Sequence, residues 1–215
     1  MPQLIMFDLD GTLVDSVPDL ATAIDLMLCD LKRPAAGIGK VRHWVGNGAT
    51  ALVQRALNGT MMTDETVDPA LLNDAQALFF KHYEQENGQH SRLYDGVSET
   101  LTALRRLQIP MAVITNKPVC FTLPLLERLG LTFDQILGGD SLAQKKPHPA
   151  PLLACMENFG VSASQSMMIG DSINDIQAAV AADVKIACVS YGYNHGQDIR
   201  TCGAHAVIDS LSELL

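Results

Sequence analysis

The chain has 215 residues, of which 47% are hydrophobic and 18% are charged, and its formal net charge at pH 7 is -9. This composition supplies a sizeable core, excludes widespread disorder and argues against a protein that binds nucleic acid or an anionic membrane surface. The length predicts one domain, or one domain with an inserted smaller module. An anionic substrate would have to be held by a local positive site rather than by the overall field.

The cysteines are dispersed and form no CxxC pair, a pattern typical of reduced thiols rather than of disulfides or a zinc site. They are Cys29, Cys120, Cys155, Cys188 and Cys202. No signal-peptide apolar region precedes Asp8, and no apolar run approaches the length of a membrane span. We therefore expect a cytoplasmic protein without a membrane partner.

The opening of the chain combines a buried strand with two carboxylates. Four apolar residues at 4–7 precede Asp8 and Asp10, and residues two apart on an extended backbone point the same way. Burying two like charges is costly unless a cation compensates them, which predicts a metal site. The Asp10-Gly11 pair is also a signal for a β-hairpin, which needs no chemistry.

Residues 16–90 show helical patterns and no strand signal. Apolar residues repeat at helical spacing over 20–31, and a glycine-rich turn at 46–48 opens a second helix that ends near Gly59. A third helix begins at Asp68, an N-cap residue that is followed by proline. This stretch predicts a separate helical module.

Beyond the helical stretch, strands and helices alternate. The expected strands are 111–114, 136–137, 167–169, 186–189 and 206–208, and the expected helices are 97–107, 121–129, 150–159 and 175–182. Such alternation implies right-handed crossovers and an α/β fold with a parallel sheet covered on both faces.

Polar residues follow three of these strands, where ligands bind in open parallel sheets. Asp8 and Asp10 end the first strand, residues 115–117 follow the second, and residues 170–172 with Asp175 follow a later one. Taken singly, each later group could be an ordinary helix N-cap. The coincidence of all three at one edge favours a functional site.

The set has a consistent chemical meaning. Asp8, Asp10 and Asp171 offer the hard oxygen ligands that Mg²⁺ prefers. Asp8 can attack a phosphate as a nucleophile, while Asp10 can protonate the leaving oxygen and then deprotonate water. Thr115 can hydrogen-bond the transferring group, and Lys146 can offset its charge, although a Lys-Pro turn is also common in solvated loops.

These motifs together resemble the phosphatase branch of the haloacid dehalogenase superfamily. The Asp-x-Asp-Gly-Thr motif is met at 8–12, the strand-end threonine at Thr115, the lysine before proline at Lys146, and Gly-Asp-Ser-x-x-Asp at 170–175. The resemblance implies a Rossmann-like core, residues 1–15 and 91–215, and a mobile all-helical cap, residues 16–90, that closes over the site.

The resemblance also implies roles for single residues. Asp8 would be the nucleophile and a Mg²⁺ ligand, and Asp171 a second ligand. Asp10 would be the acid/base and would reach the metal through its backbone carbonyl rather than its side chain. Asp175 would orient Asp171 or Lys146. Three further residues are expected near the phosphate: Gly11, Thr12 and Asn116.

Four segments, at 44–48, 114–118, 145–149 and 191–194, are similar to enzymes of this branch that hydrolyse 2-phosphoglycolate to glycolate and phosphate. Backbone amides at a helix N-terminus attract anions, so Asn47 and Gly48, with Arg55 two turns on, are expected to contact the substrate carboxylate. Alternatively, Arg55 lies on a solvated helix face.

Other functions stay open at this level. The substrate could be another small phosphorylated metabolite, such as a sugar phosphate or pyrophosphate, or the chain could be a phosphomutase. A binding module or a phosphoacceptor is a non-enzymatic alternative, although Asp10 argues against a stable acceptor. The dehalogenases of the superfamily lack this second aspartate and need no magnesium, so the resemblance favours a phosphatase or a phosphomutase. The protein is expected to be a monomer or a homodimer, and the sequence does not distinguish the two.

Overall fold

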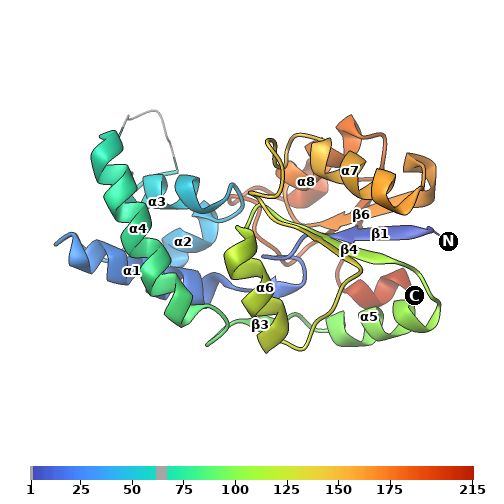
Figure 1. The fold of residues 1–215 in the computed structure, drawn as a ribbon, viewed down its shortest axis with the longest axis horizontal. Coiled ribbons are helices and arrows are strands. Elements are labelled where there is room, and N and C mark those ends of the chain that lie inside the picture. Colours follow the sequence, from blue (N-terminus) through green and yellow to red (C-terminus); the bar gives the residue numbers. More distant parts are fainter. Residues whose placement is uncertain (1, 62–66) are drawn as a thin grey trace.

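The computed structural model describes residues 2–61 and 67–215; Met1 and residues 62–66, which fall in the expected core and cap, lie outside the described residues. A six-stranded sheet in the order β5-β4-β1-β6-β7-β8 forms its centre (Figure 1). The strands are β1 (Leu4–Phe7), β4 (Met111–Ile114), β5 (Gln135–Leu137), β6 (Ser166–Gly170), β7 (Lys185–Val189) and β8 (Ala206–Ile208). All neighbouring pairs are parallel, which confirms the expected α/β class.

The central strand β1 is buried on both faces, as its apolar run predicts. Ile5 and Phe7 join the core formed with α5 and α6, whereas Leu4 and Met6 join the core formed with α7 and α8, because side chains alternate along a strand. These helices are α5 (Val97–Arg106), α6 (Val119–Arg128), α7 (Ala150–Phe159) and α8 (Ile173–Ala181). Because β1 pairs with β4 and β6 in parallel, the hairpin interpretation of the opening motif is wrong.

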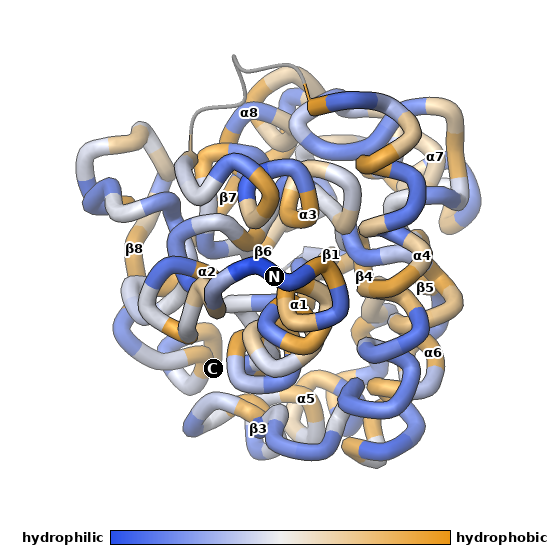
Figure 2. The backbone as a smooth tube through the Cα atoms, turned by 90° about the vertical axis from the view of Figure 1, so that its left-hand side faces the viewer, coloured by the Kyte–Doolittle hydropathy of each residue, from blue (hydrophilic) through white to orange (hydrophobic). Residues whose placement is uncertain are grey.

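Four helices lie beyond the carboxyl end of the sheet, on the left in Figure 1. They are α1 (Val17–Asp30), α2 (Ile38–Trp44), α3 (Ala49–Asn58) and α4 (Pro69–Glu86). Figure 2 shows hydrophilic and hydrophobic residues side by side along them, as in amphipathic helices. We call residues 16–90 the helical module. Among the described residues, no helix is both long and apolar enough to cross a bilayer.

Two chain segments connect the sheet to the helical module, and they are held together. β2 (Val14–Asp15) pairs antiparallel with β3 (Arg92–Leu93). Next to this pair, the buried carboxylate of Asp19 on α1 accepts hydrogen bonds from the backbone amides of Gly88, His90 and Ser91. Three short 3₁₀ helices complete the chain: η1 (Ala163–Gln165), η2 (Ile199–Thr201) and η3 (Leu211–Leu214).

Candidate active site

Asp8 lies directly after β1 and is largely buried. Its Oδ1 accepts the backbone amide of Leu9 at 2.7 Å and lies 2.9 Å from the Lys146 Nζ. Burial raises the pKa of Asp8 to about 7, and the Lys146 charge opposes that shift. The sheet thus presents one strand-end carboxylate to a buried ammonium.

Asp171 follows β6, the strand beside β1, and completes an acidic cluster. Its carboxylate accepts the Thr12 hydroxyl at 2.9 Å and the Tyr193 amide at 2.5 Å. Ligand oxygens of Asp8, Asp171 and Asp175 all lie within 4.8 Å of one another. Burial first, and then the charges of its two acidic neighbours, raise the pKa of Asp171 well above its usual value.

Lys146 and Asp175 form a buried ion pair under this cluster. The Lys146 Nζ lies 2.6 Å from the Asp175 Oδ1, and Asp175 also accepts the amide and hydroxyl of Ser172. Burial alone would lower the pKa of Lys146, but Asp175 and Asp8 together raise it. Ser172 is the N-cap of α8 with Asp175 in its capping box. The N-cap interpretation is therefore right for Ser172 and compatible with a site.

The donor set fits a hard divalent cation. Asp8 and Asp171 bring two carboxylates close together. Burial is the main cause that raises the pKa of each, and the charge of Asp8 adds to the shift of Asp171. The oxygens of Asp175 are already occupied by Lys146 and residues 171–172. A Cβ on Gly11 would lie 2.2 Å from the Asp171 Oδ2. The absence of a side chain at residue 11 therefore lets the Asp171 carboxylate lie against the turn that follows β1.

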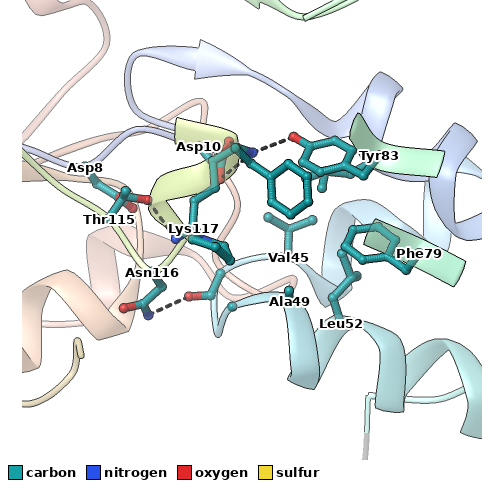
Figure 3. A pocket seen from close by; sticks show the side chains of 15 residues that line it. Asp8, Asp10, Val45, Ala49, Leu52, Phe79, Tyr83, Thr115, Asn116 and Lys117 are labelled. Carbon is teal, nitrogen blue, oxygen red and sulfur yellow. Dashed lines mark hydrogen bonds and ion pairs between the residues drawn. The ribbon is translucent and has the colours of Figure 1, made fainter. Parts of the chain in front are cut away.

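Asp10 points away from this cluster, toward the helical module. Its Oδ1 accepts the Ser16 hydroxyl at 2.5 Å and lies 3.1 Å from the Lys117 Nζ. The same ammonium donates to the Tyr83 hydroxyl at 2.5 Å, as Figure 3 shows. Burial would lower the pKa of Lys117, but Asp10 and Tyr83 outweigh it, so the ammonium stays charged.

Thr115 and Asn116 follow β4 and face the same edge. The Thr115 hydroxyl accepts the Lys117 amide at 3.1 Å, which leaves its proton for another acceptor. The Asn116 side chain instead donates to the carbonyls of Gly46 and Lys146, each at 2.9 Å. Asn116 therefore joins the Lys146 loop to the helical module.

The loop between α2 and α3 brings Gly48 to the site but not the other two residues expected there. Arg55 is 8% exposed, and its guanidinium donates to the Trp44 carbonyl at 2.5 Å and to the Asn47 Oδ1 at 2.8 Å. Neither Asn47 nor Arg55 lines the cavity described below. Arg55 supports the loop from behind, and its expected contact with a substrate stays a prediction.

A small cavity separates the sheet edge from the helical module (Figure 3). Its volume is about 40 Å³. Asp8, Asp10 and Thr115 lie on the sheet side, while Val45, Leu52, Phe79 and other apolar residues line the opposite side. No role for Lys117 follows from the sequence, because its partners Asp10 and Tyr83 are far away along the chain.

Comparisons with known proteins show the family to which the chain belongs. The model of the haloacid dehalogenase-like hydrolase family matches residues 5–189. A phosphoglycolate phosphatase of Pseudomonas putida is 52% identical over 217 residues, which cover all of this chain and 79% of that protein. The phosphoglycolate phosphatase of Colwellia psychrerythraea is 46% identical and covers 99% of this chain and 95% of its own length.

A solved structure gives the same result. The crystal structure of a predicted phosphoglycolate phosphatase from Haemophilus somnus superposes with a TM-score of 0.92 at 38% identity, covering 99% of this chain and 96% of the other. The chain therefore belongs to the haloacid dehalogenase-like hydrolases, as its motifs indicate.

Proposed function

We propose that this hydrolase is a Mg²⁺-dependent phosphatase that converts 2-phosphoglycolate to glycolate and phosphate through an aspartyl-phosphate on Asp8. The observation that supports it best is the convergence of Asp8, Asp171 and Lys146 at the carboxyl edge of the sheet, where Asp8 also lines a small cavity. The names of the relatives at 46% and 52% identity support the substrate.

The two carboxylates of the opening motif have different roles in this reaction. An oxygen of Asp8 forms a bond to phosphorus as the bond from phosphorus to the glycolate oxygen breaks, and Asp10 gives that oxygen a proton. Asp10 then takes a proton from water, whose oxygen attacks phosphorus and releases phosphate and the Asp8 carboxylate. Asp10 lines the cavity and turns its carboxylate toward Lys117, away from the acidic cluster, which suits contact with the leaving group.

Asp8 and Asp171 would hold Mg²⁺ through their carboxylates, with Asp10 adding its backbone carbonyl. When bound, the cation offsets the negative charges of the carboxylates and the phosphate. Lys146 holds Asp8 in place and offsets charge on the transferring group, and the free proton of Thr115 donates to that group.

The helical module acts in this proposal as a cap. Its apolar residues exclude water from the cavity, which strengthens every electrostatic interaction there. The paired linkers β2 and β3 mark the place where a rigid movement of residues 16–90 against residues 1–15 and 91–215 would be absorbed.

The test is magnesium-dependent phosphate release from 2-phosphoglycolate beside sugar phosphates and pyrophosphate. We expect 2-phosphoglycolate to have the highest kcat/KM and Asp8→Asn to abolish release. Asp10→Asn should accumulate phosphate on Asp8, visible by mass spectrometry of the intact protein. Preference for another phosphate would overturn the substrate alone. A mutase product without net phosphate release would overturn the reaction.

A further inference from the structure

Lys117 is the one positively charged side chain among the described residues that line the cavity. Its side chain is 3% exposed, and its Nζ lies 3.1 Å and 3.3 Å from the two Asp10 oxygens. Around it, the side of the cavity formed by the helical module is apolar, with Leu52 and Phe79 as examples. An acid group carried by a substrate would therefore meet Lys117 as the one cationic side chain among the described residues of the cavity lining.

The short length of 2-phosphoglycolate makes the position of Lys117 decisive. A single methylene group separates the leaving oxygen from the carboxylate, so the carboxylate must lie close to the group that protonates the leaving oxygen. That group is Asp10 in the proposed function, and the Lys117 ammonium is in direct contact with it. The Arg55 guanidinium is bound to Trp44 and Asn47 outside the cavity lining.

Tyr83 supplies a second polar group at the same place. Its hydroxyl oxygen accepts a hydrogen bond from Lys117, which leaves the phenolic proton available for a further acceptor. The ring is 1% exposed and stacks on Phe79 at 5.4 Å between centroids. The hydroxyl is therefore held in place, and it reaches the cavity from α4 rather than from the sheet (Figure 3).

We propose that Lys117 and Tyr83 form the subsite that binds the carboxylate of the substrate and so select acidic phosphate esters with a one-carbon spacing. The inference rests on the proposed phosphatase function and identifies the residues that would determine which phosphate esters the enzyme prefers. Hydrogen bonds from an ammonium to a carboxylate in a buried site are stronger than bonds between neutral groups. Lys117 comes from the sheet edge and Tyr83 comes from the helical module. The subsite is therefore complete only when the helical module is in contact with the sheet edge.

The test compares 2-phosphoglycolate with 2-hydroxyethyl phosphate, which has the same length and no charge on its tail. The readout is the ratio of their kcat/KM values in wild type, Lys117→Met, Tyr83→Phe and the control Lys81→Met, an exposed position on α4. We expect wild type to prefer 2-phosphoglycolate and Lys117→Met to lower the ratio roughly 10- to 100-fold. Tyr83→Phe should lower it less, mainly through KM, and Lys81→Met should not change it.

The possible outcomes separate the inference from the function. Equal losses on both substrates in Lys117→Met would mean that Lys117 only positions Asp10, and would overturn the subsite. A wild-type enzyme that hydrolyses both substrates equally well would overturn the subsite but keep the phosphatase. No phosphate release from either substrate would overturn both. If Lys117→Met does not fold, Tyr83→Phe decides alone, since it removes a single oxygen: an unchanged ratio overturns the subsite.

Discussion

Gly11 lies directly against the Asp171 carboxylate of the acidic cluster. Its φ is +93°, a backbone conformation that disfavours any side chain, and an added Cβ would lie 2.2 Å from the Asp171 Oδ2. The glycine therefore serves two purposes, the turn after β1 and the free approach of Asp171. A glycine that has the positive φ but no close neighbour allows the effects of these two requirements to be measured separately.

Gly160 provides that comparison, because its φ is +64° but an added Cβ meets nothing within 4 Å. We expect Gly160→Ala to lower the free energy of unfolding by about 1 kcal/mol and to leave kcat/KM unchanged. Gly11→Ala should cost at least as much stability and should also lower kcat/KM, because Asp171 must move. Urea denaturation and phosphate-release assays measure the two effects; full activity in Gly11→Ala would contradict the proposed role of Asp171.

Single residues also mark the limit of what the sequence predicts. The strand-end carboxylates Asp8 and Asp171 and the Lys146 side chain meet as expected, because parallel strands deliver their ends to one edge. Lys117 and Arg55 do not follow from the pattern. The partners of each are set by the packing of the helical module on the sheet, and no local spacing encodes that packing.

At the scale of elements, the loop between α2 and α3 is attached to the sheet edge from several sides. The Gly46 carbonyl accepts the side-chain amides of Asn116 at 2.9 Å and Asn174 at 3.3 Å. The His195 Nδ1 lies 2.9 Å from the carbonyl oxygen of His43, which is in the last turn of α2. These contacts hold the helical module in the position that closes the cavity.

His195 makes this contact dependent on pH. Burial lowers its pKa below the usual 6.5, the Arg55 charge acts in the same direction, and the bond to the His43 carbonyl opposes them. The folded state thus prefers the neutral ring, so this contribution to stability is present above pH 6.5 and is lost as the pH falls through the lowered value.

We therefore expect wild type to lose more stability than His195→Gln between about pH 7.5 and pH 5.5. The difference should be a fraction of a kcal/mol, since the ring is partly exposed and solvent screens its charge. Urea denaturation at both pH values measures it, with the exposed His90→Gln as a control that should follow wild type. A larger loss in His195→Gln than in wild type would reverse the sign and contradict this account.

The elements that the sequence missed share one property, which is their shortness. Helix α2 has seven residues and contains Gly39, so no apolar period is long enough to indicate it. Strands β2 and β3 have two residues each, and the whole helical module lies between them in the sequence. The longer elements, β1 and α4 among them, lie where their apolar patterns and caps predict.

At the scale of the whole molecule, the fold concentrates negative charge where it is costly. The chain has a formal net charge of -9, and Asp8, Asp171 and Asp175 form a buried cluster in which Lys146 is the one ion-pair partner among the described residues. Binding energy gained by a cation at this point is added directly to the stability of the folded state. Metal removal should therefore be visible in unfolding as well as in activity.

We expect Mg²⁺ to raise the unfolding temperature of protein previously treated with EDTA. At a free Mg²⁺ concentration of 100 times the dissociation constant, the gain in the free energy of unfolding should be about 2.7 kcal/mol. Asp171→Asn, which keeps the shape and removes one buried charge, should be at least as stable as wild type in EDTA and should gain less than about 1 kcal/mol from Mg²⁺. The exposed Glu157→Gln should respond as wild type does. Calorimetry with and without Mg²⁺ measures all three proteins, and an equal gain in Asp171→Asn would place the metal elsewhere in the chain.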